Sequence, residues 1–461
     1  MSAIDQRTTK QRTAKRRTTG ERTSDERKRD ATVEPTVADA LGPGLTSLIG
    51  VPAVEVEFWD RSTIGDRDGP GRLRVKSLDA LRRIIWSPDQ LGFARAFVAG
   101  DIDIIGPVPE VLRALRVNER RTPRAMAEAV PSIVAATRRL GGVGPRLPAP
   151  PEELVPRGRR HSMRRDKRAV SHHYDVGNEF YELVLGEAMT YSCARFTEPG
   201  GSLEAAQAAK HELICRKLGL HDIEQRSHAH GRRPRLLDVG CGWGSMAIHA
   251  ATRHDVDVVG ITISEEQATY ARRRVTDAGL ERRVEIRIQD YREVDDGPFD
   301  AISSIGMSEH VGAELIDTYF SRLHDLLRPG GRLLNHAISS VGGSRLRRRS
   351  FLCRYVFPDG ELLDIADGLR SMERAGFEIR DVENLREHYA ETLRCWVSNL
   401  QARWDDAVAL VGDRRARVWL LYMSGSINGF DDAGISLHQA LGVRNTADGT
   451  SHVPRTRRGW D

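Results

Sequence analysis

The stretch RLLDVGCGWGSMAIHAA, residues 235–251, decides the fold. The run LLDV predicts a strand, and SMAIHAATRH, which begins at Ser245, predicts a helix. Between them, Gly240, Gly242 and Gly244 form a turn that can adopt positive φ angles and lets a ligand approach the backbone closely. A tight strand-to-helix turn without a ligand is the alternative interpretation of these glycines.

Strands and helices alternate on both sides of this turn. This alternation predicts an α/β fold with a parallel sheet that helices cover on both faces. The strands are expected at RLLDVGCG (235–242), VDVVGITIS (256–264), VEIRIQD (284–290), FDAISSIG (299–306) and GRLLNHAIS (331–339).

The rest of the chain divides by composition. Residues 1–34 are polar and charged with almost nothing apolar, which predicts a disordered tail. Residues 35–145 contain strand and helix patterns such as AVEVEFW and VPEVLRALRV, so we expect a small domain there. A proline-rich basic linker is expected at 146–164, the main domain at 165–440 and a C-terminal tail at 441–461.

The overall composition excludes several classes of protein. The 461 residues are 39% hydrophobic and 29% charged, and no run approaches the about 18 apolar residues that cross a bilayer, so we expect a cytoplasmic protein. The five cysteines lack CxxC spacing, which indicates neither a zinc site nor a disulfide framework. The net charge of +5 favours an anionic partner, but no signature of a nucleic-acid-binding motif is present.

Two kinds of cofactor would suit the glycine turn. A nicotinamide dinucleotide site needs an acidic residue at the end of the second strand, yet GITIS, residues 260–264, has none. The motifs DVGCGWG, TISEEQ and QDYR instead resemble those of the class I S-adenosylmethionine-dependent methyltransferases.

Further motifs narrow this resemblance to one family. SHHYDVGNEFYELVLGEAMTYSCARF, LLDVGCGWGSMAIHAA, VVGITISEEQ, QDYR, SIGMSEHVG and HYAETLRCW occur in this order. The chain therefore resembles the cyclopropane-fatty-acyl-phospholipid synthases and mycolic acid cyclopropane synthases, densely over 165–435 and more loosely over 91–106. The resemblance implies a Rossmann-like class I methyltransferase fold, with a seven-stranded, mostly parallel sheet beside a smaller N-terminal α/β domain.

The resemblance also implies an activity. It is transfer of a methyl group from S-adenosylmethionine to the cis double bond of an unsaturated phospholipid acyl chain, with formation of a cyclopropane ring. The alternative is a methyl-branching fatty acid methyltransferase, which gives a 10-methylene chain that a partner reductase converts to a 10-methyl chain. A homodimer is expected on the same ground.

The matching motifs indicate which residues of this chain correspond to the site residues of the family. Those implied for S-adenosylmethionine are Tyr191, Ser192, Asp238, Gly240, Gly242, Thr262, Gln267, Gln289, Asp290 and Tyr291. Those implied for a bound bicarbonate that acts as the base are Cys193, Glu309, His336, Tyr422 and the backbone of Ile338. Glu309 would orient the bicarbonate, while His336 and Tyr422 would donate hydrogen bonds to it.

Three neighbouring positions need a separate interpretation. His310 is expected to support the site or cap a helix rather than to act in catalysis. Ser308 replaces an aromatic residue of the family pattern, and Ser426 stands where many members have a cysteine. That cysteine is therefore dispensable, which favours chemistry through bicarbonate.

Two basic runs predict a membrane contact. Several cations beside an anionic surface would hold the protein reversibly at the inner face of the plasma membrane, with aromatic neighbours at the level of the headgroups. A solvated charge run is the alternative interpretation. The first run is Arg157, Arg159, Arg160, Arg164, Arg165, Lys167 and Arg168; the second is Arg345, Arg347, Arg348, Arg349 and Arg354, interleaved with Leu346, Phe351, Leu352, Tyr355 and Phe357.

Overall fold

The structure is a computed structural model of the chain. It describes residues 35–49, 51–117, 123–142, 144–154, 176–228, 231–344, 346–358 and 360–460. The expected tail at 1–34, most of the expected linker and the first basic run lie outside the described residues.

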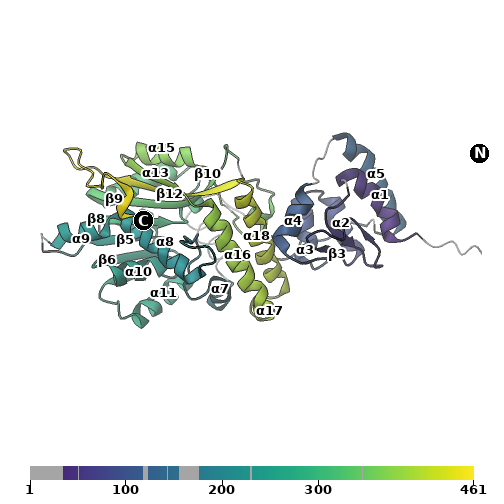
Figure 1. Ribbon diagram of the computed structural model, residues 1–461, viewed down its shortest axis with the longest axis horizontal. Coiled ribbons are helices and arrows are strands. Elements are labelled where there is room, and N and C mark those ends of the chain that lie inside the picture. The colour runs from purple at the N-terminus through teal and green to yellow at the C-terminus, as the bar shows by residue number, and fades with distance from the viewer. Residues whose placement is uncertain are drawn as a thin grey trace, which may run out of the picture.

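A mixed sheet forms the centre of the main domain (Figure 1). Its strand order is β11-β12-β9-β8-β5-β6-β7, and the short β10 pairs with the end of β9. Strands β5 to β9 confirm the five expected strands and run parallel, whereas β12 is antiparallel to both of its neighbours. The bounds are β5 Arg235–Val239, β6 Asp257–Thr262, β7 Val284–Ile288, β8 Phe299–Ile305, β9 Leu327–Ser340, β10 Leu363–Asp364, β11 Glu378–Asn384 and β12 Ile435–Val443.

Helices cover both faces of this sheet, as predicted. On one face, α8 to α11 share a hydrophobic core with the strands, and on the other face α13 and α15 do so (Figure 1). The fold is therefore that of a class I methyltransferase. The bounds are α8 Leu203–Leu218, α9 Leu220–His228, α10 Ser245–Arg253, α11 Glu265–Asp277, α13 Ile316–Leu326 and α15 Ile365–Arg374.

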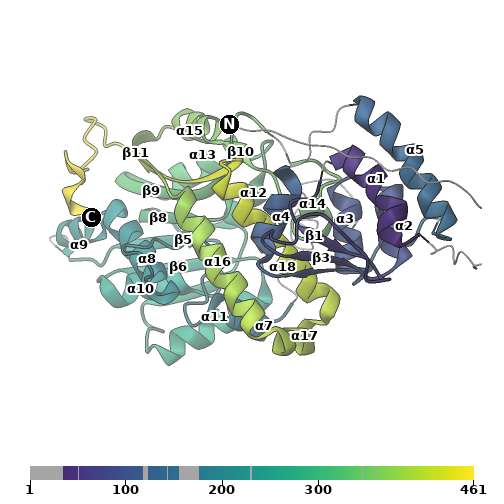
Figure 2. The same cartoon turned by 45° about the vertical axis from the view of Figure 1, so that its right-hand side comes forward.

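A group of further helices separates the sheet from the N-terminal part of the chain (Figures 1 and 2). Their core is rich in aromatic rings, and Trp396 at its centre is completely buried. The helices are α7 Asn178–Leu185, α14 Phe351–Tyr355, α16 Arg386–Ala402, α17 Trp404–Val411 and α18 Asp413–Asp431.

The N-terminal part forms the expected smaller α/β domain, with strand order β2-β1-β3-β4. It contacts the main domain at α18, where the Asn428 amide donates to the Pro109 carbonyl and Arg417 pairs with Asp103 at 2.9 Å. Its elements are α1 Val37–Ile49, β1 Glu55–Glu57, β2 Thr63–Ile64, β3 Arg72–Val75, α2 Leu78–Trp86, α3 Gln90–Val98, β4 Ile102–Ile105, α4 Val108–Val117 and α5 Pro123–Arg139.

The end of the chain is attached to the main domain, although the sequence suggested a tail from residue 441. Strand β12 continues through Val443, and Trp460 is only 6% exposed because it packs into the core beside α8. The Arg457 guanidinium also lies 2.6 Å from the buried Asp381 carboxylate. These contacts, together with hydrogen bonds such as that from Arg332 to the His452 carbonyl, hold a segment whose polar composition gave no such signal.

The fold exposes some residues of the second basic run and its aromatic neighbours, and buries others. Arg347, Arg348 and Arg349 are exposed, whereas Tyr355 is buried and its ring lies 5.2 Å from that of Phe351. Tyr355 therefore belongs to the core and does not reach a headgroup. No described helix is long and apolar enough to cross a membrane.

Replacing Trp460 by Ala should destabilise the main domain by about 3 kcal/mol, because a buried indole leaves a cavity in the core. Differential scanning calorimetry should show a lower Tm. The matched control is Trp86→Ala, since Trp86 is 55% exposed. Equal shifts of Tm in the two variants would show that the end of the chain contributes nothing to stability.

Candidate active site

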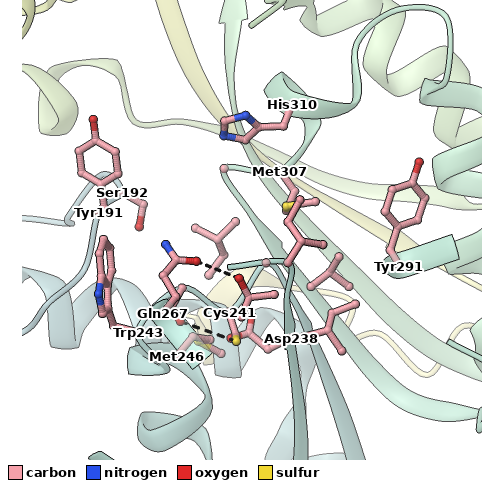
Figure 3. A pocket seen from close by; sticks show the side chains of 18 of the residues that line it. Tyr191, Ser192, Asp238, Cys241, Trp243, Met246, Gln267, Tyr291, Met307 and His310 are labelled. Atoms are coloured by element: carbon pink, nitrogen blue, oxygen red, sulfur yellow. Dashed lines mark hydrogen bonds between the residues drawn. The ribbon is translucent and has the colours of Figure 1, made fainter. Parts of the chain in front are cut away.

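A cavity opens at the carboxyl ends of β5, β6 and β8 (Figure 3). Strand β5 pairs with β6 on one side and β8 on the other, so the strand order reverses here and the following loops diverge. Every residue predicted for the methyl donor lines this cavity: Tyr191, Ser192, Asp238, Gly240, Gly242, Thr262, Gln267, Gln289, Asp290 and Tyr291. Their part in binding stays a prediction.

The glycine turn has the backbone geometry that a close ligand needs. Gly240 and Gly242 have φ angles of 76° and 54°. A Cβ on Gly240 would lie 2.5 Å from the Met307 sulfur, whereas a Cβ on Gly242 would meet nothing within 4 Å. Packing therefore requires glycine at 240, and the space at 242 leaves the backbone open to a ligand.

A buried carboxyl group and a buried amine face the cavity on opposite sides of this turn. Asp238 Oδ1 accepts a hydrogen bond from Ser303 at 2.7 Å, Oδ2 has no partner among the described residues, and burial raises the pKa of Asp238 to about 6. Lys210 Nζ donates to Ser192 Oγ at 2.9 Å, and burial lowers the pKa of Lys210 to about 7. An ammonium has three protons, so donors remain for a ligand. The pair suits the amino and carboxyl groups of the methionine part of S-adenosylmethionine.

Lys210 is a site residue that sequence reasoning missed. The signal was present in α8, whose buried face carries the polar residues Gln207, Lys210 and Lys217 among aliphatic ones. Trp243 was missed as well: its indole donates to Asn178 at 2.8 Å and closes the cavity beside Tyr191 (Figure 3).

Asp290 and Tyr291 lie at the opposite end of the cavity. The Asp290 carboxylate is held by Arg292, whose side chain donates to it at 2.7 and 2.6 Å. The Tyr291 ring packs edge-on against Tyr319 at 4.8 Å, far from Tyr191 (Figure 3). Thr262 Oγ1 donates to Gln267 Oε1 at 2.9 Å, which orients that amide in the cavity wall. Asp290 and Tyr291 thus build the wall, and the Asp290 carboxylate has a partner within the protein.

Glu309 follows β8 on the short helix α12, Ser308–Val311. Its Oε1 accepts the Ile338 backbone N–H at 2.7 Å, and its buried Oε2 has no partner among the described residues. The resemblance assigned the Ile338 backbone to bicarbonate, but in the structure Glu309 itself occupies that amide. Burial raises the pKa of Glu309 to about 7, so the carboxyl group carries a proton through much of the physiological range.

His336 and Tyr422 also present unused donors. His336 Nδ1 lies 3.2 Å from the Gln439 amide nitrogen, which can only donate, so Nε2 carries the proton and has no partner among the described residues. Burial holds the pKa of His336 well below its usual value. Tyr422 accepts a hydrogen bond from the Tyr191 hydroxyl at 3.0 Å, which leaves its own proton free. Glu309 Oε2 and His336 Nε2 are thus buried polar atoms without a partner among the described residues, and buried polar atoms in this state call for a ligand or a water molecule.

Cys193, predicted for the same site, has its own hydrogen-bond partners. It is fully buried, and its thiol donates to the Ala194 carbonyl at 3.1 Å and lies 3.7 Å from the Leu385 carbonyl. Burial raises the pKa of the Cys193 thiol, so it stays protonated and does not act as a nucleophile.

The positions around Glu309 explain one departure from the family pattern. Ser308 Oγ donates to Asn335 at 2.8 Å, inside a buried network that includes Ser304 and Tyr319. A hydroxyl group at position 308 therefore has a hydrogen-bond partner, although the family has an aromatic ring there.

His310, expected to support the site, lines the donor cavity beside Met307 (Figure 3). Ser426 lies half-buried on α18.

Comparisons with known proteins agree with this geometry. The family described as mycolic acid cyclopropane synthetase matches residues 161–440. A probable fatty acid methyltransferase of Mycobacterium tuberculosis is 42% identical over 412 residues, which are 86% of this chain and 92% of the relative. The tuberculostearic acid methyltransferase of the same organism is 34% identical, over 79% of this chain and 82% of the relative. A crystal structure of a mycolic acid cyclopropane synthase with SAH and CTAB matches with a TM-score of 0.55 and 32% identity, over 60% of this chain and 97% of that one.

Replacing Lys210 by Met should weaken binding of S-adenosylmethionine about tenfold or more, because a hydrogen bond from a charged group contributes about 1.5–3 kcal/mol. Isothermal titration calorimetry of the purified protein measures the change. Lys76→Met is the control, since Lys76 pairs with Asp103 in the N-terminal domain. Unchanged affinity in the Lys210 variant would remove Lys210 from the donor site.

The raised pKa of Glu309 predicts a pH-dependent stability. The folded chain retains a proton that the unfolded chain releases between about pH 4.5 and pH 7, so this group destabilises the fold as the pH rises through that window. Glu309→Gln removes the effect. Measured in bicarbonate-free buffer, Tm of the variant minus Tm of the wild type should be more positive at pH 8 than at pH 5, by an amount equivalent to roughly 3 kcal/mol. The same difference at both pH values would contradict a protonated Glu309.

Proposed function

Because the chain belongs to the mycolic acid cyclopropane synthetase family, we propose that it methylates the cis double bond of an unsaturated phospholipid acyl chain and closes a cyclopropane ring. Methylation of lipid acyl chains with S-adenosylmethionine is the activity of the family. The observation that carries the proposal is the hydrogen bond from Tyr191 to Tyr422, which joins the donor cavity to the buried donor groups.

The first requirement of the reaction is a dry, cation-tolerant environment. S-adenosylmethionine, when bound, supplies an electrophilic methyl group on a sulfonium. The π electrons of the alkene form the new carbon–carbon bond, which leaves a positive charge on the neighbouring carbon of the lipid. The rings of Trp396 and Trp419 lie 5.3 and 5.8 Å from that of Tyr191 and would exclude water and stabilise this cation.

The second requirement is a base that is not itself alkylated. Ring closure removes a proton from the new methyl group, and the electron pair of that C–H bond forms the third side of the ring. Bicarbonate would supply the base. Glu309, His336 and Tyr422 would hold it by donation, because burial keeps the first two neutral. A protonated Glu309 also avoids placing a free carboxylate beside a carbocation.

A second product is favoured by the similarity to the tuberculostearic acid methyltransferase over most of both chains. On that route a hydride shifts from the methylated carbon to the cation before the methyl group loses its proton. The product is an exocyclic methylene group, and a partner reductase must supply a hydride and a proton to give the methyl branch. The same residues would serve both routes.

We propose that the protein reaches its substrate at the anionic inner face of the plasma membrane. The exposed Arg347, Arg348 and Arg349 directly precede α14. Phe357, shortly after α14, lies 5.6 Å from the Tyr422 ring. Cations that contact phospholipid headgroups here would bring an acyl chain to the segment that packs on the site.

Mass spectrometry of phospholipid acyl chains tests the activity. The full chain is expressed in a host that makes cis-monounsaturated lipids but lacks such enzymes, and fragmentation distinguishes a ring from the isobaric methylene group. A gain of CH2 as a ring is the expected result, whereas a methylene group would assign the branching route. No gain, with binding of S-adenosylmethionine intact, would overturn the proposed substrate.

The Glu309→Gln variant tests the proposed mechanism in the same host. Turnover should fall about 100-fold or more, since loss of a positioned acid–base group has effects of this size, while affinity for S-adenosylmethionine is unchanged. Glu314→Gln is the matched control, because Glu314 is exposed in the loop after α12. Full activity of the Glu309 variant would remove this residue from the mechanism.

A further inference from the structure

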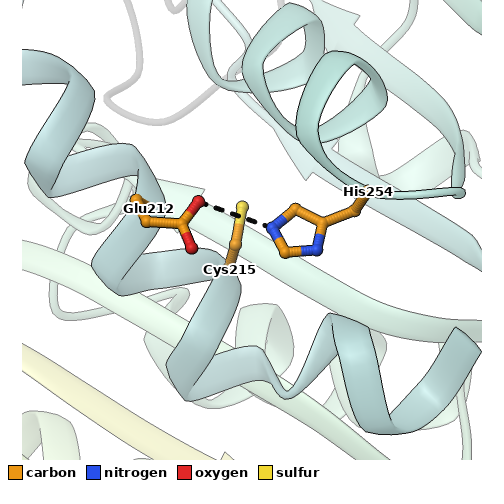
Figure 4. A group of neighbouring side chains, drawn as sticks. All are labelled: Glu212, Cys215 and His254. Atoms are coloured by element: carbon orange, nitrogen blue, oxygen red, sulfur yellow. Dashed lines mark ion pairs between the residues drawn. The ribbon is translucent and has the colours of Figure 1, made fainter. Parts of the chain in front are cut away.

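A cluster of metal-ligating side chains lies away from the donor cavity, between α8 and the end of α10 (Figure 4). Glu212 and Cys215 are one turn apart on α8, and His254 directly follows α10. One ligand atom of each lies within 4.8 Å of the others, and Cys215 projects between the other two side chains (Figure 4). None of the three lines the donor cavity.

The distances in the cluster match those between ligands of one ion. His254 Nε2 lies 3.5 Å from Glu212 Oε2, and His249 Nε2 lies 3.3 Å from the same oxygen. In a tetrahedral zinc site with bonds of about 2.0–2.1 Å, neighbouring nitrogen and oxygen ligands are about 3.3–3.4 Å apart. The His254 imidazole and the Glu212 carboxylate can therefore share an ion with little movement.

A second carboxylate orients His254 for this role. His254 Nδ1 lies 3.3 Å from Glu224 Oε1, and the Asp255 backbone N–H holds that oxygen at 3.0 Å. Glu224 thus favours a proton on Nδ1 and a lone pair on Nε2. Nε2 is buried and has no hydrogen-bond partner among the described residues. A carboxylate behind an imidazole is the usual outer contact of a zinc-bound histidine.

We propose that Glu212, Cys215 and His254 bind a zinc ion. These three side chains would supply three ligands of a tetrahedral site, with water in the fourth position, and the Cys215 thiol releases its proton to solvent as the sulfur–zinc bond forms. Thiolate and imidazole ligands select zinc over magnesium or calcium. The sequence predicted no zinc site because the cysteines lack CxxC spacing, whereas this site would combine side chains from α8 and from the residue after α10.

The position of the cluster gives the ion a structural role. Helix α8 carries Lys210 and His211 into the wall of the donor cavity, immediately before Glu212. An ion shared with His254 would fasten α8 to the segment between α10 and β6. It would thereby hold the wall of the cavity without contacting the donor.

Elemental analysis of the full chain, purified without chelators or a histidine tag, tests the site. About one zinc per chain is expected for a saturated site. Cys215→Ala and His254→Ala should abolish it, while Cys353→Ala, the matched change at another buried free cysteine, should leave it unchanged. Zinc absent from the wild type, or retained by both cluster variants, would overturn the proposal.

Two further measurements distinguish loss of the zinc site from misfolding of the variants. Glu224→Gln leaves every proposed ligand in place and should weaken zinc binding about 10–100-fold, as loss of an outer carboxylate does. Cobalt added to the metal-free chain should give the intense visible bands of a tetrahedral site and a sulfur-to-metal charge-transfer band. That band should be lost in Cys215→Ser and kept in Cys353→Ser. Wild-type zinc affinity in the Glu224 variant, or a cobalt spectrum without the sulfur band in the wild type, would show that the cluster is an ion-pair network alone.

Discussion

Desolvation is the constraint on which the rest of the site depends. Asp238, Lys210 and His336 are almost completely buried, and burial moves the pKa of each toward the value that favours its neutral form. Burial thus lowers the charge that these groups carry by themselves, and ligand groups of opposite charge would restore the ammonium of Lys210 and the carboxylate of Asp238. A carbocation on the lipid would then face aromatic rings and neutral donors, where water and carboxylates would otherwise consume it.

The fold brings together the polar groups of the site from distant parts of the chain. Reversal of the strand order between β5 and β8 opens the cavity and brings Asp238 to its edge, while Glu309 lies on α12 and lines a smaller neighbouring cavity. Helix α18 contributes Tyr422, which the segment around Tyr191 meets across the cavity. Helix α8 has two functional faces, since Lys210 points to the cavity and Glu212 to the cluster with His254. The donor site and the proposed zinc site therefore depend on the placement of one helix.

The sequence predicted the parts of this architecture that arise from local patterns. The five parallel strands are apolar runs bounded by glycines or polar residues, and the turn at Gly240 needs a positive φ whatever surrounds it. Packing between distant segments was not predictable. The residues before Trp460 in the sequence are polar, yet its indole ring is buried in the core beside α8. The Ile338 amide is taken by Glu309 because α12 turns that carboxyl group toward β9, which no motif records. Cys215 and His254 come together only when α8 and α10 pack on the same face of the sheet.

The choice between ring and methylene product follows from small energies within this shared framework. After methyl transfer, deprotonation and hydride shift compete from the same cation, and a difference of about 1.4 kcal/mol between their barriers changes the product ratio tenfold. An energy difference of this size is comparable to the contribution of one hydrogen bond. On the proposed mechanism, a displacement of the base relative to the new methyl group would be sufficient to decide it, and the hydrogen bonds of Glu309 and Ser308 are the contacts that would set the position of the base. The family thus gives the reaction class, and on the proposed mechanism the hydrogen bonds around Glu309 would select the bond that the cation forms.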